Sequence, residues 1–291
     1  MPEIARDFSE IENHMTDYEK PKRLGLKIAS FLLVFFVLAT IEHGTMTVLH
    51  FQRALDIAGN GTDNFGHAFY VMHFPSVSRV VPYSGLMTIM FTWANAICTF
   101  NWNLLDFFLI GISMEISAKF DLITNKLTSC DPEKQNYEFW RKTYTDYGRI
   151  VILTKKLDRI LSSVILTSFF SNLYHLSLQL LRSLRISGTL FHRLYFYFSL
   201  SYLILRLLTS LFSMANVNEA GKKPKDLLFL MENHCTASLR LLEQILTDDI
   251  HLTGNRIFTI NRSFVFSIIG TIITYQVVLL QFDSLTFVDA D

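Results

Sequence analysis

Ionisable and hydrogen-bonding side chains interrupt several of the long apolar stretches of this chain. They fall in four different stretches and comprise Glu42, His43, Trp93, Tyr174, His175, His192 and Tyr195. Such side chains are costly inside a membrane and therefore usually face protein or a water-filled cavity. We interpret them as the polar and aromatic edge of an outward-facing pocket. Two alternatives stay open: aromatic residues also form belts at membrane surfaces, and Glu42 and His43 also suit the polar end of a spanning helix.

The sequence lacks the residue patterns of catalytic, metal and phosphate-binding sites. P-loop, GxGxxG, HExxH and CxxC patterns are absent, and the nine histidines are scattered without ligand spacing. The three cysteines, Cys98, Cys130 and Cys235, imply no disulfide framework. Basic and acidic residues are equal in number, so no nucleic-acid footprint is visible. We therefore predict no enzyme activity, no cofactor, no metal and no nucleic-acid partner.

The composition is that of a membrane protein. Apolar residues make up 50% of the chain and charged residues 18%, whereas a soluble domain carries about 25% charged residues. Five apolar runs are each long enough to cross a bilayer, which takes about 20 residues in a helix. The predicted fold class is therefore an all-α polytopic membrane protein with five transmembrane helices.

These spans divide the chain into alternating apolar and polar segments. An N-terminal segment, 1–23, precedes the first two spans, 24–116, which are joined by a loop at 51–79. A polar helical segment follows at 117–158, with a break at Asp131-Pro132, and then come the third and fourth spans, 159–213. The chain continues with a second polar helical segment, 214–262, the last span, 263–282, and a tail, 283–291.

From Lys225 to Ile250, leucines recur at helical spacing. We expect an amphipathic helix there that packs on other helices, the alternative being a helix on the membrane surface.

The distribution of basic residues predicts the orientation. Lysine and arginine concentrate in 1–23, 117–158 and 214–262, which lie on one side of a five-span chain. The positive-inside rule places these segments in the cytosol and the tail outside. The Asn60-Gly61-Thr62 sequon then lies outside, so we expect glycosylation at Asn60. This orientation is inverted relative to G-protein-coupled receptors.

Two sequence motifs indicate a family. The last span contains Thr274-Tyr275, then five intervening residues, then Gln281-Phe282, close to the end of the chain. This arrangement resembles the terminal signature of insect gustatory receptors. Phe100 to Ser113 reads FNWNLLDFFLIGIS, and its Trp102, Asn103 and Asp106 resemble a pattern of the sugar-type members.

The resemblance implies an activity and an assembly. Insect gustatory receptors are ligand-gated, non-selective cation channels of seven spans, with a cytosolic N-terminus, in the plasma membrane of chemosensory neurons. They would form homo- or hetero-tetramers with other gustatory receptors, in contact with membrane lipids. The five spans found here align best with the family's third to seventh, so the chain appears as a member without the first two spans.

The resemblance also suggests roles for individual residues. Four copies of the last span would surround a pore, with Val278, Gln281 and Phe282 as the gate, because an apolar ring blocks ions by dewetting. Asp106 would have a structural role and pair with a polar group on a neighbouring helix, for which Arg206 is a candidate. The polar and aromatic residues named first would bind a sugar, since flat rings cover its C–H surface while polar groups satisfy its hydroxyls.

Other functions remain open at this stage. The chain would alternatively be a truncated, non-conducting subunit that modulates full-length receptors, or a gustatory receptor for tastants other than sugars. A transporter is a third reading, but internal repeats and spans broken by glycine or proline, which transporters often show, are not evident in the sequence.

Overall fold

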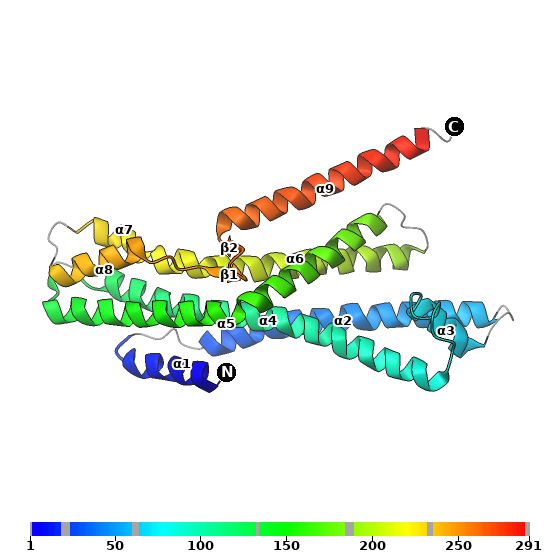
Figure 1. The fold of residues 1–291 in the computed structure, drawn as a ribbon, viewed down its shortest axis with the longest axis horizontal. Helices are drawn as coiled ribbons and strands as arrows, with labels where there is room; N and C mark the ends of the chain where they lie inside the picture. Colours follow the sequence, from blue (N-terminus) through cyan, green and yellow to red (C-terminus); the bar gives the residue numbers. More distant parts are fainter. Residues whose placement is uncertain are drawn as a thin grey trace. The chain divides into compact units, whose positions relative to one another are not determined.

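The computed structural model describes residues 2–18, 24–59, 64–131, 134–183, 189–231 and 235–288 (Figure 1). Its elements are α1 (Pro2–His14), α2 (Leu24–Gly59), α3 (Phe65–His73), α4 (Gly85–Ser129), α5 (Tyr137–Ser183), α6 (Leu190–Lys222), α7 (Pro224–Phe229), α8 (Thr236–Thr247), β1 (Leu252–Gly254), β2 (Phe258–Ile260) and α9 (Arg262–Val288). The predicted all-α membrane fold is therefore confirmed as a class. Asn60, the expected glycosylation site, lies outside the described residues.

Four helical segments of the described chain are long and apolar enough to cross a membrane. They are Leu24–Gly59, Gly85–Ser129, Leu190–Phe229 and Arg262–Gln281. The predicted third span lies within α5 and is not among them. Its sequence carries many polar side chains, and Ser162, Ser168 and Asn172 are buried within the protein. The five-span count and the orientation thus stay predictions.

The long helices extend beyond the predicted spans. The region predicted as the first loop begins with the end of α2, which runs to Gly59, and also contains α3. Helix α4 continues from the second span into the polar segment and ends at Ser129, just before the predicted break at Asp131. Residues 51–59 of α2 and 115–129 of α4 contain no proline, the residue that most strongly interrupts a helix, so their polar residues simply continue each helix beyond the predicted span.

The second polar segment is not continuously helical, contrary to the prediction. The expected helix from Lys225 to Ile250 is divided into α7 and α8, and an antiparallel hairpin of β1 and β2 follows. The hairpin turn places Asn255 and Arg256 at φ values of 49° and 59°. Asp158 of α5 accepts hydrogen bonds from the Thr253 amide at 2.6 Å and from the Thr253 hydroxyl at 2.9 Å. These tertiary contacts stabilise extended backbone within the segment 214–262, which was predicted to be helical.

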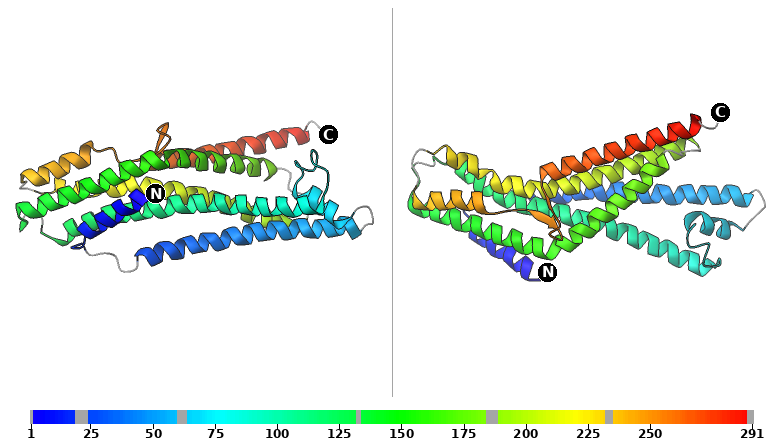
Figure 2. Two further views of the ribbon diagram at one scale, coloured as in Figure 1. Left: turned by 60° about the horizontal axis from the view of Figure 1, so that its bottom comes forward. Right: turned by 45° about the horizontal axis from the view of Figure 1, so that its top comes forward.

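The chain forms two compact units, which we describe separately. Figure 2 shows the helices of the chain from two further sides. The large unit comprises 1–30, 108–175 and 207–291, and the small unit comprises 31–107 and 176–206. In the large unit, helices α5 and α6 are joined by the Tyr147 hydroxyl, which donates to the Gly221 carbonyl at 3.2 Å. In the small unit, Phe35, Ala39, Phe107 and Tyr202 form a buried apolar cluster.

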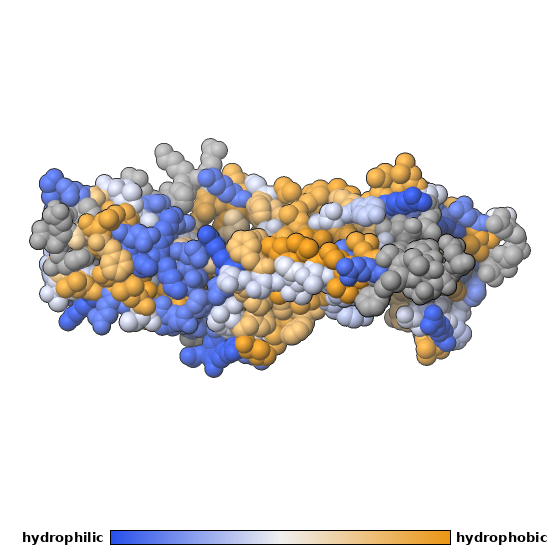
Figure 3. Space-filling model, turned by 90° about the horizontal axis from the view of Figure 1, so that it is seen from above, coloured by the Kyte–Doolittle hydropathy of each residue, from blue (hydrophilic) through white to orange (hydrophobic). Residues whose placement is uncertain are grey.

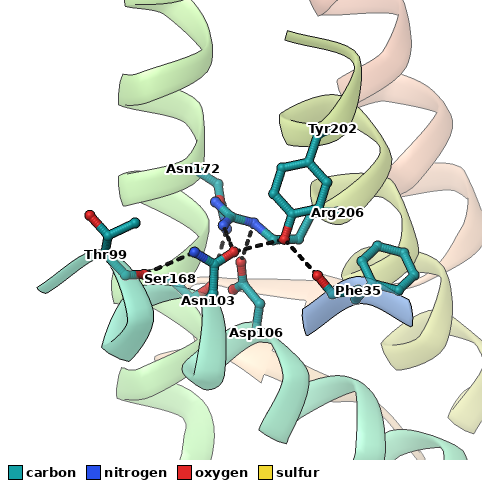
Figure 4. Close-up of polar contacts among 8 residues, drawn as sticks. All are labelled: Phe35, Thr99, Asn103, Asp106, Ser168, Asn172, Tyr202 and Arg206. Atoms are coloured by element: carbon teal, nitrogen blue, oxygen red, sulfur yellow. Dashed lines mark hydrogen bonds and ion pairs between the residues drawn. The ribbon is translucent and has the colours of Figure 1, made fainter. Parts of the chain in front are cut away.

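A buried ion pair lies beside this cluster in the small unit (Figure 4). Arg206 of α6 places Nε 3.0 Å from Oδ2 of Asp106 of α4, and the two side chains are 2% and 0% exposed. The Arg206 guanidinium also donates to Oδ1 of Asn103 and lies 4.0 Å above the Trp102 ring. Asn103 in turn donates to the Thr99 carbonyl at 2.8 Å. The FNWNLLD motif is thus the α4 half of a polar network that includes the suggested partner, Arg206.

Replacing Asp106 by Asn should strongly destabilise the protein. The change removes the charge that balances buried Arg206, and breaking a buried pair in this way costs about 3–5 kcal/mol. Thermal unfolding of the purified protein in detergent would measure the loss. Asp131→Asn is the matched control, since its partner Lys134 is 82% exposed and such surface pairs contribute about 0–1 kcal/mol. Equal stability of the two variants would show that the buried pair does not hold the small unit together.

Candidate ligand pocket and last helix

The small unit contains a polar cavity of about 680 Å³. Its wall is built from the second half of α2, the end of α5 and the start of α6. The polar side chains that line it are Glu42, His50, Arg53, Gln179, Arg182, His192, Tyr195 and Ser199. Met46, Leu181 and Phe196 complete the lining. This mixture of hydrogen-bond donors and acceptors with apolar and aromatic side chains is chemically suited to a small polar ligand.

Glu42 is at the centre of the hydrogen bonds in this cavity. Its Oε1 accepts from the Ser199 hydroxyl at 2.6 Å and from the Tyr195 hydroxyl at 3.1 Å. Gln179 donates from Nε2 to the Ser199 oxygen at 3.1 Å. Two residues of α6 thus bind the Glu42 carboxylate of α2 directly, and Gln179 of α5 supports it through Ser199. The orientation of the carboxylate is therefore fixed before a ligand arrives.

Two histidines contact each other at the cavity wall: His50 of α2, which lines the cavity, and His73 of α3. Nδ1 of His50 is 2.8 Å from Nδ1 of His73 in α3, so one ring donates and the other must accept through an unprotonated nitrogen. Burial lowers the pKa of His73, and a positive charge on His43 would lower it further. Burial therefore favours the uncharged form of His73, and Arg53 and Arg182 are the arginines that line the cavity.

The structure brings together three of the seven residues predicted to bind the ligand. Glu42, His192 and Tyr195 line the cavity. His43 is not among the lining residues and packs its ring against Phe100, with centroids 5.8 Å apart. Trp93 is 68% exposed, as expected for a residue that faces lipid.

The other two predicted binding residues belong to the large unit. Tyr174 and His175 are exposed and contact each other edge to face, with ring centroids 5.4 Å apart. Neither is among the residues that line the cavity of the small unit. Their arrangement fits the aromatic-belt alternative, which places rings at the membrane surface.

Sequence reasoning missed His50 and Arg53 as cavity residues, although a signal was present. Glu42, Met46, His50 and Arg53 are spaced four, four and three residues apart, so they share one face of a helix. The prediction of a loop from residue 51 hid this pattern, because the helical face was followed only to the end of the apolar run.

Helix α9 is mostly exposed in this single chain. It lies on the face shown in Figure 3, where hydrophobic residues gather. Val278 is 39% exposed and Tyr275 38% exposed, and Gln281 is exposed as well. The hydroxyl of Thr274 donates to the Gly270 carbonyl of its own helix at 2.9 Å. The side chain of Phe282, the third predicted gate residue, lies outside the described ones.

The first turn of α9 is fixed to the hairpin. The rings of Phe258 and Phe264 stack with centroids 4.8 Å apart, and Phe169 of α5 packs against both. Asn261 caps the helix by accepting from the Phe264 amide at 2.8 Å. This aromatic cluster therefore fixes the position of the first turn of α9, which makes few other contacts with the described part of the chain.

Known proteins share both the sequence pattern and the fold. Residues 1–289 match the family described as trehalose receptor. The gustatory receptor for sugar taste 64f of Drosophila melanogaster is 28% identical over 283 residues, which are 96% of this chain and 59% of that protein. Gustatory receptor 5a for trehalose, from the same fly, is 28% identical over 291 residues, 97% of this chain and 64% of its own length. The chain therefore spans less than two thirds of these relatives.

One solved structure shares the fold. The insect olfactory receptor OR5 from Machilis hrabei, in complex with eugenol, aligns with a TM-score of 0.62 over 95% of this chain and 74% of that one, at 18% identity. The two chains therefore share a helical architecture, and the family match along nearly the whole sequence shows that this chain belongs to the trehalose receptor family.

Proposed function

We propose that this chain is a subunit of a sugar-responsive gustatory receptor, a ligand-gated, non-selective cation channel in the plasma membrane of chemosensory neurons. The family match over residues 1–289 supports the receptor class. The observation that carries the ligand proposal is the pre-oriented Glu42 carboxylate in the cavity of the small unit.

The chemistry of the cavity favours a sugar. The second carboxylate oxygen of Glu42 would accept hydrogen bonds from ligand hydroxyls. Arg53, Arg182 and Gln179 would donate hydrogen bonds to ligand oxygens. The Tyr195 ring offers an apolar face to the C–H surface of the sugar. Its volume of about 680 Å³ is within the usual range of ligand pockets, about 300–1,000 Å³. A ligand without these hydroxyls would leave polar groups of the cavity without partners, which disfavours its binding.

The exposed last helix supports the channel proposal. Four subunits, in homo- or hetero-tetramers, would bury the apolar face of α9 around a common axis, with Val278, Gln281 and Phe282 as the gate. An apolar ring there would close the pore by dewetting, and rotation that exchanges Val278 for Gln281 would let water return. The concentration of basic residues places the N-terminus and the large unit's polar segments in the cytosol.

One observation favours a second candidate function. The chain spans 59% to 64% of its relatives, and the five helices proposed as spans are two fewer than in the family resemblance. The chain would then be a non-conducting subunit that associates with full-length receptors and modulates them.

Whole-cell recording separates these two functions. In cells that express this chain alone, we expect trehalose and other sugars to evoke a cation current, and Gln281→Leu to reduce it because the gate loses its polar residue. Surface delivery is checked by cell-surface labelling of an epitope on the C-terminus. Surface protein without current would reject the channel and support the modulatory subunit, which would then alter sugar currents of a co-expressed full-length relative.

Replacing Glu42 by Gln should weaken the sugar response without preventing folding. The variant keeps the shape of the side chain but loses the charge-assisted hydrogen bonds, which contribute about 1.5–3 kcal/mol each. The half-maximal sugar concentration should therefore rise about tenfold or more. Glu243→Gln, the same change on the exposed face of α8, is the control and should leave the response unaltered. An unchanged half-maximal concentration in the Glu42 variant would place the sugar elsewhere.

A further inference from the structure

The large unit contains a second cavity, which the ligand proposal does not use. Its volume is about 640 Å³, and it lies between the end of α1, the end of α4 and the start of α5. Four of its lining residues carry fixed positive charges, namely Lys126, Arg141, Lys142 and Arg149, against the carboxylates of Glu138 and Asp146. His14 also lines it. The cavity is therefore net positive in a chain whose overall net charge is zero.

Part of this charge is engaged by the segment that follows α1. Lys142 forms an ion pair with Asp17 and holds the pKa of that carboxyl below its usual range. The Tyr18 hydroxyl donates to Asp146 at 2.9 Å, and Tyr18 itself is buried. Lys126 lies over the rings of Tyr18 and Phe139, 4.0 Å and 5.2 Å from their centroids. This segment thus fixes the position of two of the cations that line the cavity, Lys126 and Lys142.

The two arginines are left to face the cavity. No ion pair joins Arg141 or Arg149 to an acidic residue within the described ranges, and Arg141 is exposed. They are eight residues apart on α5, with Thr145 midway, so all three share a helix face. At about 1.5 Å per residue, the arginine backbones are about 12 Å apart along the helix. Guanidinium groups bind phosphate oxygens in bidentate fashion, and this spacing suits a ligand that carries several phosphates rather than one.

The position of the cavity favours a dissolved ligand over a lipid. Lys126 is 12 residues beyond Met114, where the predicted span ends, which corresponds to about 18 Å along a helix. The headgroup layer on each side of the bilayer core is about 5–8 Å thick. With the cytosolic orientation proposed above, the cavity lies in the cytosol below the headgroups.

We propose that this cavity is a cytosolic binding site for a compact polyphosphate of the inositol phosphate type. Arg141 and Arg149 bind its phosphates, and Lys126 and Lys142 add positive charge. Thr145 lies between the two arginines and donates its hydroxyl to the Arg141 carbonyl at 2.9 Å. The site lies at the junction of α1, α4 and α5, so an occupied site would hold these three elements together.

The test is calorimetric titration of the purified chain in detergent with inositol hexakisphosphate. We expect saturable binding that weakens at least tenfold when Arg141 and Arg149 are both replaced by Gln. The control variant, with Arg240→Gln and Arg256→Gln together, removes the same two charges from exposed positions outside the cavity and should leave the affinity unchanged. An equal loss in this control, or binding by the wild type that never saturates, would mean general charge attraction and would overturn the proposal.

Two further arms keep the result interpretable. The unfolding temperature without ligand should be the same in all variants. If the double variant is less stable, Arg141→Gln alone, at its exposed position, should still weaken binding at least threefold, and an unaltered affinity would overturn the proposal.

A measurement in nanodiscs separates a dissolved ligand from a lipid. Binding that requires phosphatidylinositol bisphosphate in the bilayer, with no binding of the dissolved polyphosphate, would assign the site to a lipid headgroup and contradict the proposal. No arm depends on sugar-evoked current.

Discussion

The small unit depends on one buried electrostatic constraint, the contact of Asp106 with Arg206. Each charge alone would be prohibitively costly at 0% and 2% exposure, so each residue requires the other, and together they fix the register of α4 against α6. The start of α6 also carries Tyr195 and Ser199, which hold Glu42. Arg206 and Ser199 are seven residues, about two turns, apart. The pair that holds the helices together therefore also determines where the pocket's hydroxyl groups stand.

Sequence reasoning recovered those parts of the structure that depend on local pattern. Apolar run length predicted α2, α4, α6 and α9 within a few residues at their N-terminal ends, since a membrane requires such runs in any context. Asp106 was interpreted as structural because a carboxylate in a span needs a partner, and Arg206 was the cation available in another span. Glu42, His192 and Tyr195 line the cavity for a similar reason: polar groups in spans face protein or water.

The features that were missed depend on contacts between segments distant in sequence. The hairpin after α8 forms because Asp158, nearly a hundred residues earlier, binds Thr253, and no local pattern contains that contact. The position of an aromatic residue along a helix did not by itself show whether its ring faces lipid or a pocket. Trp93 was therefore expected in a pocket, but its side chain is 68% exposed. His50 and Arg53 were missed because the membrane boundary was treated as the end of the helix.

The composition of the pocket bears on whether a shortened chain can bind ligand. On the alignment with the family's third to seventh spans, a missing wall was to be expected. Yet the residues that hold Glu42 come from α5 and α6, and the whole lining comes from α2, α5 and α6 of this chain. The proposed ligand contacts thus all lie within this chain. Conduction would be a separate requirement, because in the proposed channel it depends on how copies of α9 meet, and the first turn of α9 is held by the Phe169, Phe258 and Phe264 cluster. The proposed pocket and the proposed gate therefore use different parts of the chain, and ligand binding and conduction must be measured separately.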